Sequence, residues 1–218
     1  MRIDPPRSGE PERGLRLLVF DRTCRGRPLL PGLSHSWAAG SRLYRGLGRL
    51  DAAFGATGWA EALAWLGSVA PGRRIAEVQF WGHGKWGGAL VGGERLDASA
   101  LVARHELWPL LEAMRSRFVL DGRGLWWWRT CETYGAVAGQ RFASAWSDFL
   151  GARTAGHTHV IGFWQSGLHS LDAGARPGWD PGEGLARGSS SAPELALGSG
   201  PGRPHTITCL HGRIPEGY

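Results

Sequence analysis

Two residues of this sequence could act together as a nucleophile and its proton carrier. Cys131 follows the apolar run 125–130, and His83 follows the run 74–81. A free thiol is only a few per cent thiolate at neutral pH, so a nucleophilic cysteine needs a nearby base or helix amides. An imidazole opposite the thiol can accept or supply the proton. The same two residues could also be a buried structural cysteine and a histidine in a turn.

The elements that would position this pair are strands that alternate with helices. Apolar and alternating patterns predict strands over 15–21, 74–81, 125–130 and 157–162. Helical spacing predicts helices over 57–69, 98–106, 109–117 and 136–150. This order indicates an α/β fold, a three-layer α/β/α sandwich with a mostly parallel sheet. His83 and Cys131 would both lie at the carboxyl edge of that sheet, where ligands gather in such folds.

The remaining segments are predicted from composition. Residues 1–14 resemble a disordered tail, residues 32–47 a loop, and "GGALVGGERL" (87–96) a glycine-rich hairpin. Low hydrophobicity and repeated Gly, Pro and Ser predict that 172–204 is a mobile flap over the cleft, outside the core. Residues 205–218 would return to the domain, with a last strand over 205–214 that joins the sheet.

Composition favours one globular domain, which residues 15–171 would form. The chain has 218 residues, 42% of them hydrophobic and 20% charged. Its net charge is +6, but Lys85 is the only lysine and the arginines are scattered singly, so no nucleic-acid partner is expected. No apolar run reaches the ~20 residues that span a bilayer, and the start lacks a signal peptide. We therefore expect a cytoplasmic protein without a membrane partner, and three cysteines argue against a disulfide framework.

Other kinds of site are less well supported by the sequence. Gly82, Gly84 and Gly87 match the dinucleotide-binding pattern, but "GALVGG" follows them where that motif needs a helix. There is no Gly-x-Ser-x-Gly elbow of a serine hydrolase. Four side chains could hold zinc if their strands were neighbours, but nothing in the sequence pairs these strands. They are His157, His159, Cys209 and His211. No metal or other cofactor is expected.

Two longer segments carry a resemblance to a known family. "VQFWGHGKWGGALVGGERLD" (78–97) resembles the histidine segment of caspase-like cysteine peptidases. "WWRTCETYGAVAGQRFASAWSDFLGARTAG" (127–156) resembles their cysteine segment. In that superfamily a His-Gly ends one strand and the nucleophilic cysteine ends the next. The likeness covers roughly residues 15–162, and it is greatest to a caspase-like domain of large bacterial surface proteins.

The resemblance implies a caspase-like fold and a cysteine endopeptidase that acts on a protein or peptide. Cys131 would be the nucleophile and His83 the general acid/base, with the backbone amides of Gly84 and Cys131 as the oxyanion hole. Asp21 and Arg129 would line the pocket beside the scissile bond, and Glu132 is a further substrate-binding candidate.

The charges of that pocket allow three outcomes. Asp21 alone would favour a basic substrate residue, which is the prediction adopted here, whereas Arg129 would favour an acidic one. A pair between the two would leave a neutral pocket. Arg129 stands where the family has a small or acidic residue, and Trp81 and Trp86 crowd the histidine turn. A non-catalytic module that binds a peptide in the same cleft, or other thiol chemistry such as transpeptidation, therefore stays open.

Overall fold

A six-stranded, mostly parallel sheet forms the centre of the computed structural model, which describes residues 13–218 except 28–29 and 120–122. The strand order is β12-β10-β9-β5-β1-β4. In chain order these strands are β1 (Leu15–Asp21), β4 (Ala52–Ala56), β5 (Ile75–Trp81), β9 (Leu125–Arg129), β10 (Arg153–His157) and β12 (Leu168–Leu171). The pairs from β4 to β10 are parallel, and only β12 runs antiparallel, against β10. The predicted α/β class with a mostly parallel sheet is confirmed.

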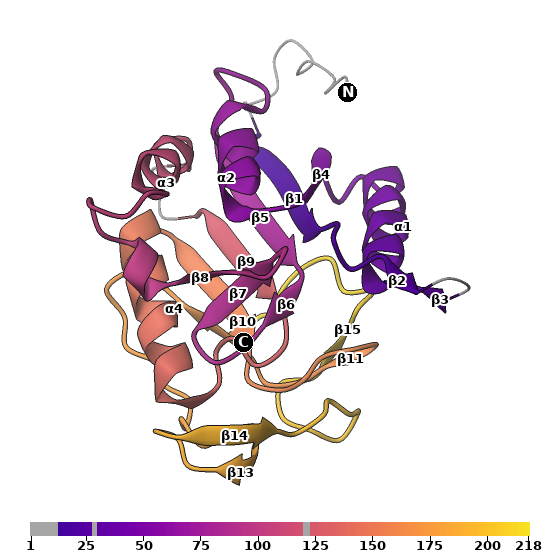
Figure 1. The fold of residues 1–218 in the computed structure, drawn as a ribbon, viewed down its shortest axis with the longest axis vertical. Coiled ribbons are helices and arrows are strands. Elements are labelled where there is room, and N and C mark those ends of the chain that lie inside the picture. Colours follow the sequence, from indigo (N-terminus) through magenta and orange to yellow (C-terminus); the bar gives the residue numbers. More distant parts are fainter. Residues whose placement is uncertain (1–12, 28–29, 120–122) are drawn as a thin grey trace.

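The two faces of the sheet are covered differently (Figure 1). The α-helices of the described chain are α1 (Leu33–Gly46), α2 (Trp59–Ser68), α3 (Trp108–Arg115) and α4 (Ala136–Leu150). Helices α2, α3 and α4 share one apolar core with the sheet. The opposite face is covered by α1 over β1 and β5, and by the C-terminal segment 207–218 over β9 and β10. Half of the third layer is therefore irregular chain instead of helix.

The remaining strands of the described chain are short and form small sheets outside the central one. A three-stranded sheet consists of β6 (His83–Gly84), β7 (Gly88–Val91) and β8 (Glu94–Asp97), so the glycine-rich hairpin predicted over 87–96 is confirmed. Three two-stranded sheets pair β2 (Gly26–Arg27) with β3 (Leu30–Pro31), β11 (Trp164–Gln165) with β15 (Ile207–Thr208), and β13 (Leu185–Gly188) with β14 (Pro193–Ala196).

Tryptophans of β9 explain why this strand lies at the centre. Trp126, Trp127 and Trp128 are fully buried and alternate between the two faces. Trp126 and Trp128 both contact Trp146 of α4, with ring centroids 5.1 Å apart. Trp127 packs on the other face with Leu168. Each buried ring contributes about 2–3 kcal/mol of hydrophobic stabilisation, so β9 is fixed firmly under the turn that follows it.

Several predicted elements are wrong in place or kind. The segment 32–47, predicted to be a loop, forms helix α1. The strand predicted over 157–162 lies at 153–157 instead. The helix predicted over 98–106 is only a single 3-10 turn, η1 (Ala98–Ala100). Strands β4 and β12 were not predicted. The predicted tail 1–14 falls almost wholly outside the described residues.

The prediction that the C-terminal segment joins the main sheet is wrong. Its strand β15 has two residues and pairs with β11. Buried polar contacts hold the rest of the segment: Tyr44 of α1 donates to the carbonyl oxygens of Cys209 and His211, at 2.7 and 2.8 Å. The alternating pattern at 205–214 therefore reflects a chain that packs across the face of the sheet.

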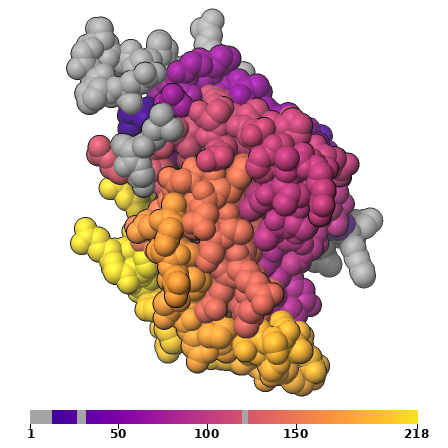
Figure 2. Space-filling view, turned by 90° about the vertical axis from the view of Figure 1, so that its left-hand side faces the viewer, coloured from indigo at the N-terminus to yellow at the C-terminus, as the bar shows by residue number. Residues whose placement is uncertain are grey.

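Residues 172–204 are mostly exposed, but Trp179 joins the apolar core, which corrects the expectation that the whole segment lies outside it. They form the hairpin β13–β14 at one end of the molecule (Figure 2). Trp179 is 8% exposed and stacks on Tyr134 and on His169, at centroid distances of 5.5 and 4.9 Å. Its indole N–H donates to the Tyr134 carbonyl at 3.1 Å. Trp179 therefore anchors this segment, which is otherwise low in hydrophobic residues, to the rest of the fold.

We expect Trp179→Ala to release this segment. Loss of the two ring contacts and the hydrogen bond should speed tryptic cleavage after Arg187 by about tenfold, because local opening exposes the site to the protease. Timed digestion of the folded protein with mass spectrometry measures this rate. Leu195→Ala, which removes a side chain that is 51% exposed, is the matched control. Equal cleavage rates in wild type and Trp179→Ala would contradict the anchoring role.

Candidate active site

His83 and Cys131 lie after neighbouring parallel strands. Strands β5 and β9 are hydrogen-bonded neighbours, and their last paired positions are Trp81 and Arg129. His83 and Cys131 each come two residues after these partners. Because parallel strands end at the same edge, the register places both residues at the carboxyl edge of the sheet, at the same height.

The two turns that carry these residues pack directly against each other. The Gly87 amide donates to the Thr133 carbonyl at 2.9 Å. A Cβ atom on Gly84 would lie 2.7 Å from the Cys131 carbonyl oxygen and would also overlap the Thr133 hydroxyl. The Thr133 hydroxyl is in turn 2.5 Å from that of Thr130. Glycine at position 84 is therefore what allows the histidine turn to contact the cysteine turn.

Gly84→Ala should separate the two turns. Because the added methyl group meets backbone atoms, we expect a loss of about 2 kcal/mol in the free energy of unfolding, in the range of overpacked cores. Urea denaturation measures this loss. Gly46→Ala is the matched control, because a Cβ there meets nothing within 4 Å. A Gly84→Ala protein as stable as Gly46→Ala would show that the turns are not in contact.

Backbone strain gathers in the same two turns. Among the described residues, positive φ angles outside glycine occur at five positions, and three of these are Trp86 (21°), Glu132 (41°) and Ala136 (62°). Side chains with a Cβ rarely adopt this region, at a cost of order 1–3 kcal/mol each. Strain of this kind is typical of turns that must hold a functional group in a fixed place.

Cys131 is a shielded thiol. Its Sγ lies 3.8 Å from the Ile161 carbonyl oxygen, and all three cysteines of the chain are free. Burial raises the pKa of Cys131, and the negative charge of Glu132 raises it further, while backbone hydrogen bonds from Ile161 and Cys131 act in the opposite direction. The neutral thiol is the favoured form in this conformation.

His83 is exposed at the same edge and is positioned by a residue of α1. The Trp37 ring meets the imidazole edge to face, with centroids 5.9 Å apart and planes at 75°. Within the described part of the chain, no hydrogen bond joins His83 to Cys131. Catalytic hydrogen bonds are often long in unliganded proteins and tighten on substrate, so an unliganded dyad need not show this bond.

We expect alkylation of Cys131 to reveal its raised pKa. Since only the thiolate reacts, the rate with iodoacetamide should still be rising at a pH where a small free thiol has levelled off. Glu132→Gln removes one cause of the shift and should increase the rate at neutral pH by several-fold. Glu106→Gln, which removes an exposed charge elsewhere, is the control. Peptide mapping by mass spectrometry gives the rate at Cys131; a plateau at or below the pH of the free thiol contradicts the raised pKa.

Glu132 directly follows Cys131 and is little exposed. Its side chain is 9% exposed, and its amide donates to the His159 carbonyl at 2.9 Å. Burial raises the pKa of its carboxyl group, and the nearby Lys85 lowers it. The Lys85 ammonium itself lies over the Trp86 ring, 4.6 Å from the centroid. Glu132 and Lys85 thus place opposite charges on the two turns.

Asp21 closes β1 as predicted, but its carboxylate is occupied by local donors. Oδ1 accepts from the amide and hydroxyl of Thr23 at 2.8 and 2.7 Å. Oδ2 accepts from the Gly92 amide at 3.3 Å and lies 3.7 Å from the Cys24 thiol. The residue is 2% exposed. Asp21 ties the end of β1 to the β7–β8 hairpin, and a substrate side chain would have to compete with these bonds.

Arg129 does not reach a surface pocket, which corrects its predicted role in binding a substrate side chain directly. It is 5% exposed and lies on the face of the sheet that α1 and the C-terminal segment cover. Its guanidinium donates to Gln165, Tyr44 and the carbonyl oxygens of Cys209 and His211. The physical reason is the strand period: Arg129 shares the side of Trp127, whose ring centroid is 4.5 Å away.

The histidines considered as zinc ligands contact different partners in the structure. Within the described residues, no group of three or more His, Cys, Asp or Glu side chains could hold one metal ion. The His157 ring lies 3.2 Å from the Ser166 carbonyl, and burial lowers its pKa to about 3. His159 contacts the Thr158 hydroxyl, and His211 the Thr208 hydroxyl, each at 2.9 Å.

Two site residues were missed by the sequence analysis. Trp37 was missed because the segment 32–47 was predicted to be a loop. The buried residues of this segment, Ser34, Ser41 and Tyr44, nevertheless follow helical spacing together with Trp37. Ile161 was missed because the predicted strand 157–162 would have made it part of the sheet. In the structure it lies in the loop after β10. Nothing in the local sequence marks its backbone as a neighbour of Cys131.

Comparison of the chain with protein-family models, with characterised proteins and with solved structures gives no match. A search of the described helices for one with the length and apolar character to cross a bilayer gives none. The function must therefore be argued from the residues at the carboxyl edge of the sheet.

Proposed function

We propose that this protein is a caspase-like cysteine endopeptidase with Cys131 as nucleophile and His83 as general acid/base. The observation that carries the proposal is the β5–β9 register, which sets the two residues at equal height after adjacent parallel strands. A His-Gly and a cysteine that end neighbouring strands are what the resemblance implies. The contact of Gly84 with the cysteine turn and the strained φ angles in both turns support it.

The proposed reaction begins with a neutral thiol. His83 takes the Cys131 proton as Sγ forms a bond to the carbonyl carbon of the substrate, and the carbonyl oxygen becomes an oxyanion. The C–N bond then breaks, and the leaving amine takes the proton from His83. Water attacks the resulting thioester, gives a proton to His83, and the C–S bond breaks as the thiol is restored. Because burial raises the pKa of Cys131, proton transfer must accompany the attack.

The oxyanion would be stabilised by the backbone amides of Gly84 and Cys131. Both belong to turns that the packing holds rigid, and such preorganised donors are worth about 10²–10³ in rate.

The substrate residue before the scissile bond is proposed to be basic, through Asp21. Arg129 is engaged under the C-terminal segment, so Asp21 is the charge that stays near the edge of the sheet. An arginine or lysine would compete with Thr23 for the carboxylate, as a charge-assisted bond can.

Profiling the products of a peptide library tests this function. Wild type should cut peptides, with Arg or Lys enriched before the new carboxyl terminus, and Asp21→Ala should lose that enrichment while still cutting. Asp97→Ala is the control for removal of an acid. No cleavage by wild type would reject the peptidase, and a preference for Asp or Glu would reject the role of Asp21.

A second candidate is a non-catalytic module that binds a peptide at the same edge. Two observations favour it: no hydrogen bond in the described structure joins His83 to Cys131, and aromatic side chains are exposed in the loop after Ile161. Phe163 is 56% and Trp164 37% exposed, and such rings are typical anchors in peptide recognition. Peptides that bind wild type and Cys131→Ala equally, without being cut, would identify this function.

A further inference from the structure

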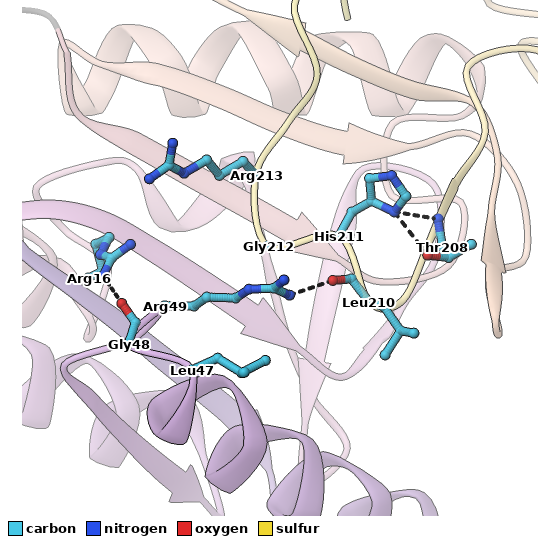
Figure 3. A pocket seen from close by; sticks show the side chains of 9 residues that line it. All are labelled: Arg16, Leu47, Gly48, Arg49, Thr208, Leu210, His211, Gly212 and Arg213. Carbon is cyan, nitrogen blue, oxygen red and sulfur yellow. Dashed lines mark hydrogen bonds between the residues drawn. The ribbon is translucent and has the colours of Figure 1, made fainter.

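A pocket lies on the face of the sheet that carries the C-terminal segment (Figure 3). It is an open pocket with a volume of about 630 Å³. Its walls are the start of β1, the turn after α1 and residues 208–213. This volume is in the range of small-molecule sites.

The charged side chains that line this pocket are all basic. Arg16, Arg49 and Arg213 come from three different parts of the chain, with His211 beside them, and neither Asp nor Glu is among the lining residues. Burial lowers the pKa of Arg16, and the charges of Arg13 and Arg213 lower it further, while those of Asp51 and Glu77 raise it. Like charges brought together in this way favour an anion between them.

Arg16 and Arg49 are held by backbone carbonyl groups, whereas Arg213 has no such contact in the described structure. One nitrogen of Arg16 donates to the Gly48 carbonyl, and one nitrogen of Arg49 to the Leu210 carbonyl at 2.5 Å. Arg213 is exposed, and the described chain gives it neither a hydrogen bond nor an ion pair. The guanidinium nitrogens that these bonds leave unused can donate to phosphate oxygens.

Two acids, Asp51 and Glu77, act on Arg16 from outside the lining of the pocket. Asp51 is engaged by Arg13, at 2.9 Å, and by the Arg16 amide at 2.7 Å. Glu77 is buried, accepts from the Gln79 side chain at 2.7 Å, and has a pKa raised by burial. Because three arginines line the pocket and neither acid does, the charge of its lining is positive.

Apolar side chains border the arginines. Leu47 is 56% and Leu210 53% exposed, and both line the pocket (Figure 3). A single phosphate ion would leave most of the volume and both leucines unused. We propose that this pocket binds a small organic molecule that carries two or more phosphate groups, with the phosphates on the arginines and the carbon skeleton on the leucines.

Calorimetric titration tests the site with three probes in metal-free, low-salt buffer: pyrophosphate, adenosine diphosphate and adenosine. Pyrophosphate should bind saturably and adenosine diphosphate more tightly, while adenosine alone should not bind. Arg213→Gln should weaken pyrophosphate binding by about tenfold, since one charge-assisted contact is lost. Its side chain has no hydrogen bond in the described fold, so the variant should remain folded, as its melting curve can verify.

Arg104→Gln is the matched control, because it removes an exposed arginine outside the pocket. No saturable binding of pyrophosphate, or equal weakening by Arg213→Gln and Arg104→Gln, would overturn the proposal. So would adenosine diphosphate that binds no more tightly than pyrophosphate. Because the readout is binding, the result is independent of any peptidase activity.

Discussion

Cys131→Ala and His83→Ala are each expected to lower kcat/KM for a cleaved peptide by at least about 10³-fold, because residues that act as one catalytic unit fail together. The double variant should be no less active than either single one. Cleavage of a fluorogenic peptide, chosen from the library products, gives the rates. Melting temperatures should stay within a few degrees of wild type, since His83 is exposed and the thiol makes one weak contact.

Two matched variants control for the loss of any thiol or any imidazole. Cys209→Ala removes a second free cysteine, and His35→Ala removes an exposed histidine of α1. Both should keep the full rate. Activity that survives in both Cys131→Ala and His83→Ala would refute the assignment of the dyad.

Arg129→Ala is expected to lower the free energy of unfolding by about 4 kcal/mol. The substitution removes hydrogen bonds to Gln165, to Tyr44 and to the carbonyl oxygens of Cys209 and His211, each worth about 1 kcal/mol, although Tyr44 still donates to the two carbonyls. It also removes the cation from the Trp127 ring. Urea denaturation gives the loss. Hydrogen exchange should show that protection falls most at residues 207–214, which the guanidinium holds to the sheet.

The controls separate geometry from charge. Arg129→Lys keeps the charge but cannot serve acceptors on two sides of a planar group, so it should recover less than half of the loss. Arg115→Ala, on the exposed side of α3, should cost less than about 1 kcal/mol. An Arg129→Ala protein with wild-type stability, or with unchanged exchange at 207–214, would show that the arginine does not hold this segment.

The sequence predicted the elements whose side chains repeat a clear pattern. Strand β1 and helix α4 lie where the sequence analysis placed them. The apolar run 15–21 is enough by itself to predict a strand, and the helical spacing of 136–150 is enough to predict a helix. Strand β10, with the sequence "RTAGH", has no such signal. Its Gly156 is buried because the Tyr134 ring packs against it, a contact that only the folded chain supplies.

The same distinction holds for the site. The turn positions of His83 and Cys131 follow from strand ends and could be predicted. The role of Arg129 could not, because it depends on the C-terminal segment, which lies about 80 residues further along the chain. Trp179 likewise gains its partners only when the chain returns to α4 and β12. Contacts of this range leave no local pattern to read.

The most direct test of the Cys131–His83 site is to trap the covalent intermediate. Wild type is mixed with an ester of a cleaved peptide, quenched in acid, and examined by intact mass and peptide mapping. The account predicts an added acyl group on Cys131 that hydroxylamine releases, as expected of a thioester, and no such group in Cys131→Ala. Peptide turnover without an adduct on Cys131, or an adduct that forms equally in Cys131→Ala, would contradict it.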